Sequence, residues 1–208
     1  MTSVQQNEDD IGIVKVQDGS IYRGDLIVGA DGVHSRIRRE MWRLAELKHA
    51  GQITKEEKDG QWASLIQRQD TRGDNLTSTF YLGMTVDYVC VFGISNAVPN
   101  LRPGEQVTGY QYGRSLLVFP GQNGRVYWFL FKRLDRQYEY HSAPRWSPRD
   151  ATKIAKEFAL DDVWVGLSFN QIWINREVVG ITNLEENVFS TWHHGRVVCI
   201  GDSMHKVC

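Results

Sequence analysis

Continuously apolar runs near the two ends of the chain predict two buried strands. Residues 26–30 (LIVGA) and residues 197–200 (VVCI) contain no polar side chain. A run of this kind is typical of a strand covered on both faces, as in a parallel sheet. The first run leads through Asp31-Gly32 into residues 35–47, where Arg, Glu, Leu and Met favour a helix. The pattern therefore predicts a strand, a tight turn and a helix.

The middle of the chain has the character of an antiparallel sheet. Residues 79–82, 88–94, 115–119 and 126–131 are rich in Val, Phe, Tyr and Leu, and turns containing Pro and Gly separate these runs. The Asn123-Gly124 pair between the last two runs is the clearest hairpin signal.

Three further segments complete the predicted elements. Asp18-Gly19 predicts a hairpin turn, and the polar residues 50–60 predict a solvated loop. Ser147 and Pro148 are typical of the start of a helix. One face of that helix is apolar, and it carries Ala151, Ile154, Ala155, Phe158 and Ala159.

The composition excludes several classes of protein. Of the 208 residues, 41% are hydrophobic, which supports a packed core rather than general disorder. The net charge is −1 and no basic run is dense, so we expect no nucleic-acid partner. Residues 1–10 form a polar N-terminus without the apolar stretch of a signal peptide, and no later run has the length of a membrane helix.

The cysteines indicate a reducing compartment. Cys90, Cys199 and Cys208 are odd in number and show no paired spacing, so we expect no disulfide framework and a cytoplasmic location. The His and Cys residues between positions 193 and 208 fit no standard zinc spacing, so we expect no metal site.

Two polar motifs follow the two apolar runs. Residues 31–38 (DGVHSRIR) place an acid, a glycine, a hydroxyl and arginines around one turn, which can present charge and backbone N–H groups to a dinucleotide. In residues 201–205 (GDSMH), Asp202 can accept hydrogen bonds from sugar or ribityl hydroxyls, and Gly201 lets a ligand approach closely. Taken singly, each motif is equally well explained as an ordinary capped turn.

Together, the two motifs resemble signatures of the class A flavin-dependent monooxygenases, the para-hydroxybenzoate hydroxylase-like family. The family's Gly-Asp motif is matched by Gly201, Asp202 and His205. Its Asp-Gly motif is matched by Gly29, Ala30, Asp31, Gly32, Ser35 and Arg38.

Other positions resemble the fungal secondary-metabolite branch of this family. They include Trp192, Gly195-Arg196 and His205-Lys206. Members of the branch commonly epoxidise or hydroxylate prenylated terpenoid, meroterpenoid or indole-diterpene intermediates. The resemblance therefore implies a hydrophobic small-molecule substrate.

The resemblance implies an α/β fold with an added antiparallel sheet. Residues 11–50 and 187–208 would be parts of an incomplete, Rossmann-like FAD-binding domain, and residues 61–186 would form an inserted antiparallel substrate domain. FAD is the implied cofactor and NAD(P)H the implied co-substrate, with one oxygen atom of O2 delivered to the substrate.

The resemblance also assigns roles to residues. Asp202, beside Gly201, would hold a hydroxyl of FAD, whereas Asp31, Gly32 and Arg38 would support the pyrophosphate and the path of NAD(P)H. Tyr110 and Tyr112 are the candidate catalytic residues of the substrate pocket, with plain sheet packing as the alternative.

The chain departs from the family pattern at both ends. It lacks the nucleotide-binding Gly-x-Gly-x-x-Gly turn, and the glycine-rich stretch that follows His-Lys in the branch is absent. We therefore expect a fragment of a longer enzyme, and membrane association of the full-length form stays open. The alternatives are a degenerate, non-catalytic fragment and a related FAD-dependent oxidoreductase without oxygen transfer.

Overall fold

The computed structural model describes residues 3–6, 11–54, 57 and 84–207, which fall into two compact units. Unit 1 comprises Met1–Thr85, Glu139–His141 and Glu185–Cys208, and unit 2 comprises Val86–Tyr138 and Ser142–Leu184. The chain thus leaves unit 1 after Thr85, returns to it briefly at Glu139–His141, and returns to it again at Glu185. The predicted run at residues 79–82 lies outside the described residues.

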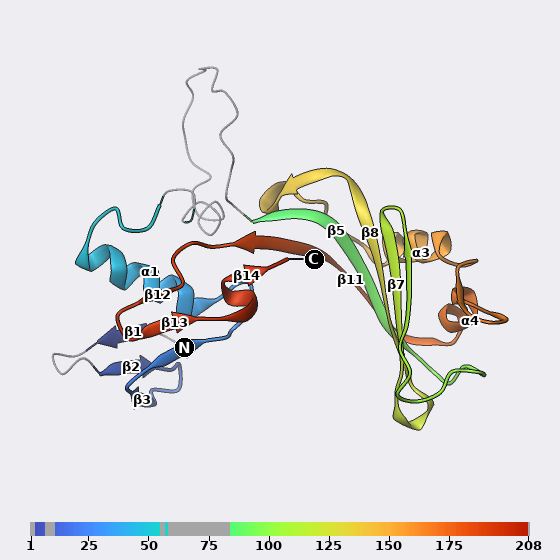
Figure 1. Cartoon of the computed structure of the whole chain (residues 1–208), viewed down its shortest axis with the longest axis horizontal. Helices are drawn as coiled ribbons and strands as arrows, with labels where there is room; N and C mark the ends of the chain where they lie inside the picture. Colours follow the sequence, from blue (N-terminus) through green and yellow to red (C-terminus); the bar gives the residue numbers. More distant parts are fainter. Residues whose placement is uncertain (1–2, 7–10, 55–56, 58–83, 208) are drawn as a thin grey trace, which may run out of the picture. The chain divides into compact units, whose positions relative to one another are not determined.

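Unit 1 contains a small sheet covered by one helix (Figure 1). Its strands are β4 (Ile27–Gly29), β12 (His193–His194) and β13 (Val197–Cys199), and its helix is α1 (Arg36–Lys48). The two apolar runs meet in this sheet: β13 pairs with β4 in parallel, with Cys199 opposite Gly29. Helix α1 buries Met41, Trp42 and Ala45.

The prediction that the two apolar runs are buried on both faces is wrong. In the second run, Ile200 is 46% exposed. In the first run, Ile27 and Gly29 are buried, whereas Val28 between them is 50% exposed. Because neighbouring side chains of a strand point to opposite faces, helix α1 covers the face of Gly29, where Ile37 packs, and leaves Val28 on the other.

The N-terminal part of unit 1 forms a second sheet. Its strands are β1 (Ser3–Gln6), β2 (Gly12–Lys15) and β3 (Ile21–Gly24), all antiparallel. The predicted Asp18-Gly19 turn joins β2 to β3, with Gly19 at φ 89°. Val4 attaches the polar N-terminus to helix α1. Its side chain is fully buried, and its N–H donates to Glu40 Oε2 of α1 (3.1 Å).

The polar segment after α1 is not a simple solvated loop. Ile53 and Glu57 are both buried. Glu57 Oε1 accepts hydrogen bonds from the N–H groups of Ser190 and Thr191, both at 2.8 Å. A buried carboxylate is tolerated when it is hydrogen-bonded in this way, so the prediction of a solvated loop is wrong at these two positions.

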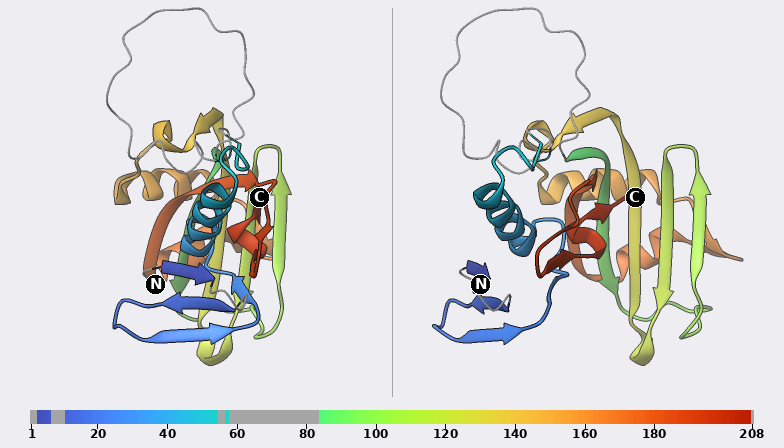
Figure 2. Two further views of the ribbon diagram at one scale, coloured as in Figure 1. Left: turned by 90° about the vertical axis from the view of Figure 1, so that its left-hand side faces the viewer. Right: turned by 60° about the vertical axis from the view of Figure 1, so that its left-hand side comes forward.

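Unit 2 is built on an antiparallel sheet with the strand order β11-β5-β8-β7-β6 (Figure 2). The predicted hairpin is confirmed between β7 and β8, where η1 (Gln122–Gly124) holds Asn123 at φ 59° and Gly124 at φ 72°. The five strands are β5 (Thr85–Ser95), β6 (Val107–Gln111), β7 (Arg114–Pro120), β8 (Val126–Glu139) and β11 (Arg176–Val188).

Short elements complete the described residues. They are β9 (Asp162–Trp164), β10 (Leu167–Ser168), β14 (His205–Lys206), η2 (Tyr140–Ser142) and η3 (Gly201–Ser203). Strand β9 pairs with β10 in unit 2, whereas β14 pairs with the end of β11 in unit 1.

Two helices, α3 (Pro148–Glu157) and α4 (Phe169–Ile174), cover one face of the unit 2 sheet (Figure 1). The predicted start of α3 is confirmed as a capping box between Ser147 and Asp150. The core between the helices and the sheet centres on Trp128, whose indole N–H donates to Ser95 Oγ (2.9 Å). No helix in the described part of the chain is long and apolar enough to span a membrane.

We expect Gly93→Ala to lower the free energy of unfolding by about 1–3 kcal/mol, because a Cβ at Gly93 would lie 2.3 Å from both the Trp128 ring and the Val178 carbonyl oxygen. The matched control is Gly109→Ala in β6, where the nearest atom would be 4.0 Å away. Urea denaturation of the whole protein measures both changes. Equal effects of the two substitutions would contradict this account of packing.

Candidate functional site

The two predicted motifs meet at one edge of the unit 1 sheet. Strands β4 and β13 are parallel, so the loops that follow them, Asp31-Gly32 and Gly201-Asp202, leave the sheet at the same edge. The Ile200 N–H donates to the Gly29 carbonyl oxygen (2.9 Å), and Ser203 Oγ lies 2.9 Å from the same oxygen. These hydrogen bonds join the two loops at their bases.

Asp31 caps helix α1. Its Oδ2 accepts hydrogen bonds from the N–H groups of Arg36 (2.7 Å) and Ile37 (3.2 Å), and its Oδ1 accepts one from the Ser35 hydroxyl (2.5 Å). Ser35 Oγ in turn accepts from the Arg38 N–H (2.9 Å). The protein's own side chains therefore accept hydrogen bonds from the first three N–H groups of the helix. A phosphate at the helix N-terminus would otherwise accept these hydrogen bonds.

The capping bonds affect the acidity of Asp31. Burial by itself raises the pKa of this carboxyl, but the hydrogen bonds from Ser35, Ile37 and Arg36 outweigh burial, so the pKa lies below its ordinary value of 3.8. The side chain is thus charged at neutral pH and complements the positive end of the helix dipole.

Arg38 links the two loops through their backbones. Its guanidinium is fully buried and donates to the carbonyl oxygens of Val33 (2.8 Å) and Ser203. It also lies over the Phe189 ring, 4.1 Å from its centroid. Burial lowers the pKa of Arg38 to about 10, which leaves the group cationic at neutral pH. Arg38 therefore bridges the Asp-Gly loop and the Gly-Asp loop.

Cys199 lies beside this bridge as an inert side chain. Burial raises the pKa of its thiol to about 11; the negative charge of Asp31 adds to this shift, and Arg38 opposes it. The thiol is therefore protonated at neutral pH and is a poor nucleophile.

The glycines of the two loops face open space. Gly32 and Gly201 have φ values of 80° and 60°, which favour glycine over residues with a side chain. A Cβ added at either glycine would meet nothing within 4 Å. The Asp202 side chain is exposed beside them. Among the predicted residues, Gly32, Gly201 and Asp202 are thus open to a ligand. Arg38 is buried, and Asp31, although exposed, is hydrogen-bonded within the protein.

The two predicted tyrosines lie in unit 2, and neither is packed in the core. Tyr110 is 81% exposed and Tyr112 is 97% exposed. Plain sheet packing, the alternative for both residues, therefore does not describe them. Their catalytic role stays a prediction.

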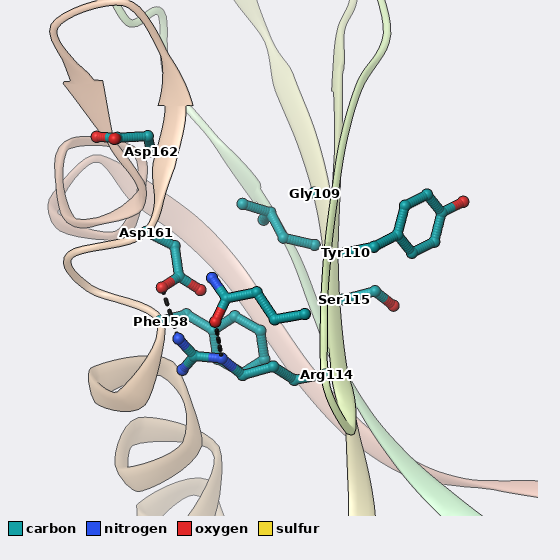
Figure 3. A pocket seen from close by; sticks show the side chains of 9 residues that line it. Gly109, Tyr110, Arg114, Ser115, Phe158, Asp161 and Asp162 are labelled. Carbon is teal, nitrogen blue, oxygen red and sulfur yellow. Dashed lines mark hydrogen bonds and ion pairs between the residues drawn. The ribbon is translucent and has the colours of Figure 1, made fainter.

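Tyr110 is one of the residues that line a small pocket, but its ring does not point into it (Figure 3). Arg114 binds Asp161 across this pocket (2.8 Å), whereas the Tyr110 ring and the Ser115 side chain point away from that pair (Figure 3). The pocket has a volume of about 60 Å³, which is too small for an organic substrate. The pair therefore joins β7 to the segment between α3 and β9.

Two residues at the site were not predicted from the sequence. Ser203 holds the Gly-Asp loop against β4. Glu185 Oε1 lies 4.0 Å from His34 Nε2, and Glu185 Oε2 lies 3.6 Å from Lys206 Nζ. Glu185 therefore connects a residue of each motif region. The position of Ser203 directly after Gly-Asp is a local signal, whereas nothing in the sequence around Glu185 distinguishes it from an ordinary surface acid.

Parallel strands followed by glycine turns and an exposed carboxylate are typical of an α/β domain that binds a nucleotide cofactor. The family model described as "FAD binding domain" matches residues 1–208. The chain therefore belongs to this FAD-binding family, as its motifs predict, and FAD is the family's cofactor.

The relatives are fungal proteins. The chain is 58% identical over 194 residues to the FAD-dependent monooxygenase cle3 of Aspergillus versicolor, covering 93% of this chain and 35% of that protein. It is 48% identical over 207 residues to the FAD-dependent monooxygenase spyC of Aspergillus fumigatus, covering 100% of this chain and 39% of that protein. The chain thus spans little more than a third of the length of these relatives.

Solved structures confirm the fold class. A salicylate hydroxylase substrate complex superposes with a TM-score of 0.55 at 16% identity, covering 98% of this chain and 44% of that one. An HpxO variant of Klebsiella pneumoniae complexed with FAD gives a TM-score of 0.51 at 21% identity, covering 99% of this chain and 43% of that one. The predicted combination of an α/β domain and an antiparallel sheet is therefore confirmed.

We expect Asp31→Asn to lower the free energy of unfolding by about 1 kcal/mol at pH 7, because the charged cap of α1 is lost. The folded-state pKa of Asp31 is lowered, so its stabilisation is complete above the ordinary value of 3.8 and is lost as the pH falls through the lowered pKa. Denaturation at several pH values should show the difference between wild type and variant shrinking below pH 3.8.

The matched control for this prediction is Asp25→Asn, which changes an exposed acid outside the cap. A difference between wild type and Asp31→Asn that stays constant down to the acid transition would contradict the role of the Asp31 charge.

Proposed function

We propose that the whole protein is an FAD-dependent monooxygenase that inserts one oxygen atom of O2 into a hydrophobic small molecule, with NAD(P)H as the reductant. The observation that carries this proposal is the meeting of the Asp31-Gly32 and Gly201-Asp202 loops at one sheet edge in a chain of the FAD-binding family. The names of the fungal relatives, all FAD-dependent monooxygenases, support the same activity.

The open residues at the edge fit FAD. The exposed Asp202 carboxylate can accept hydrogen bonds from ribityl or ribose hydroxyls, and the space over Gly32 and Gly201 allows the cofactor to approach the backbone. Asp31 and Arg38 act as positioning residues for this contact, because their polar atoms hold helix α1 and the two loops. FAD, when bound, supplies the redox chemistry.

The substrate part of the proposal is supported by an aromatic face in unit 2. Trp128 and Leu130 of β8 point to the helices, so the alternate residues Tyr127, Phe129 and Phe131 lie on the other face of the sheet. The register pairs Phe119 with Tyr127, which places Phe119 on that face as well.

The rings of this face contact one another. Phe129 lies 6.0 Å from Phe119, 6.5 Å from Phe92 and 6.4 Å from Phe131, measured between ring centroids. Tyr110 pairs with Ser115 in the β6–β7 register, and Ser115 pairs with Phe131 in the β7–β8 register. Tyr110 therefore lies on the same face of the sheet as these rings. A partly exposed aromatic layer suits an apolar ligand, which supports a prenylated terpenoid-type substrate that is epoxidised or hydroxylated.

The test of the proposed function uses the purified whole protein with a prenylated terpenoid intermediate. We expect bound FAD, substrate-dependent NADPH oxidation with matching O2 uptake, and one ¹⁸O atom in the product when the reaction runs under ¹⁸O2. NADPH oxidation with FAD present but no label in the product would instead indicate an oxidoreductase without oxygen transfer. Absence of both FAD and activity would indicate a non-catalytic protein.

We expect Asp202→Ala to weaken FAD affinity of the whole protein about ten- to a hundredfold, because a charge-assisted hydrogen bond contributes ~1.5–3 kcal/mol. Flavin absorbance after gel filtration and titration of the apoprotein with FAD measure the change. Asp25→Ala, an exposed acid of the same unit, is the control and should retain wild-type affinity. Equal FAD affinity in the two variants would remove Asp202 from the cofactor site.

We expect Arg38→Lys to lower stability by about 1–3 kcal/mol even though the charge is kept, because one ammonium group cannot reproduce the forked contact with the Val33 and Ser203 carbonyl oxygens. If Arg38 positions the loops, saturating FAD should reverse part of the decrease in melting temperature of the Arg38→Lys variant. A variant as stable as the wild type would show that the bridge between the loops is dispensable.

A further inference from the structure

Unit 2 contains a cavity that the proposed monooxygenase function does not use. It has a volume of about 390 Å³ and lies between the start of α3, the end of α4 and strand β11. This volume falls within the range of small-molecule sites. Its wall on β11 includes Val179 and Ile181, and Ile181 packs against the core that the two helices share. The cavity is therefore on the helix-bearing face, opposite the aromatic face.

Two fixed indole rings form part of the wall. The Trp146 N–H donates to Asn183 Oδ1 (2.6 Å), and Asn183 Nδ2 donates to the Pro144 carbonyl oxygen (3.0 Å), so this ring is anchored by its polar edge. Trp173 packs edge-on against the buried Trp128, with 5.7 Å between ring centroids. Held rings lose little conformational freedom when a flat ligand packs on them, which favours binding.

The charge at the cavity comes from Arg176. It is the one charged side chain among the described residues that line the cavity. Its guanidinium carbon lies 4.2 Å from the centroid of the Trp173 ring, and Nη1 donates to the Trp173 carbonyl oxygen (2.8 Å). This hydrogen bond and the ring contact orient the exposed guanidinium at the cavity. An oriented guanidinium is well suited to bind a carboxylate.

The hydroxyls at the cavity are already engaged. Ser147 Oγ donates to Asp150 Oδ2 (2.6 Å), and Thr152 Oγ1 donates to the Pro148 carbonyl oxygen (3.2 Å). Ala151 and the β11 side chains Val179 and Ile181 add apolar surface. The wall is thus apolar and aromatic, with one cationic group available for recognition.

We propose that this cavity is a second ligand site, which takes a flat aromatic carboxylate with its rings against Trp146 and Trp173 and its carboxylate on Arg176. None of the residues at Asp31-Gly32 or Gly201-Asp202 contributes to it. The site therefore shares no residue with the cofactor loops.

The experiment titrates the FAD-loaded whole protein with 2-naphthoate by calorimetry. We expect one site with a dissociation constant on the order of 10–100 µM. Val179→Phe, which fills the cavity from β11, should abolish binding. Val178→Phe is the matched control, because this neighbouring residue is half exposed and outside the lining, and it should leave binding unchanged.

A second comparison tests the charge. Arg176→Gln should weaken 2-naphthoate about tenfold but leave the binding of the uncharged 2-naphthamide unchanged. Bound FAD, measured in every sample, shows whether the cofactor site is intact, so a failure here is distinguishable from a failure of the proposed function. No binding to the wild type, or binding that Val179→Phe leaves unchanged, would overturn the proposal.

Discussion

The buried guanidinium of Arg38 is the interaction on which the candidate site depends. It donates to a backbone carbonyl oxygen in each of the two loops, and one of these acceptors, Ser203, is 165 residues away from Arg38 in the chain. A buried cation is costly unless its donors are satisfied, so both loops must adopt the conformation that presents those carbonyl oxygens. The same constraint fixes the open edge beside Gly32, Gly201 and Asp202, where FAD is proposed to bind.

The polar groups at the site have two different roles, and these roles follow from the burial of Arg38. Asp31 and Arg38 are prominent charged residues of the first motif, yet their polar atoms form hydrogen bonds with helix α1 and with the loops. The positions without such a structural role are two glycines and the exposed Asp202 carboxylate. A cofactor site of this type is built by rigid supporting groups that do not themselves need to contact the ligand.

In unit 2 the sheet separates two different chemical environments. One face carries the helices and the core around Trp128, together with the cavity at Arg176. The other face carries the partly exposed layer that includes Phe92 and Phe129. Alternation along β8 creates both, because each successive side chain points to the opposite face. One strand can therefore support a packed core and an apolar binding surface.

The sequence by itself determined the features that depend on local or patterned signals. The strands of the two apolar runs, the Asn123-Gly124 hairpin and the Ser147 cap were predictable because strand propensity, turn geometry and capping act over a few residues. The two motifs and their order indicated the FAD-binding family. Tertiary structure decided the rest: the buried Glu57, the exposed Val28 and the commitment of Arg38 to Ser203 depend on partners distant in sequence. Such contacts carry no local signal, because they exist only once the strands have paired and the helix has packed on them.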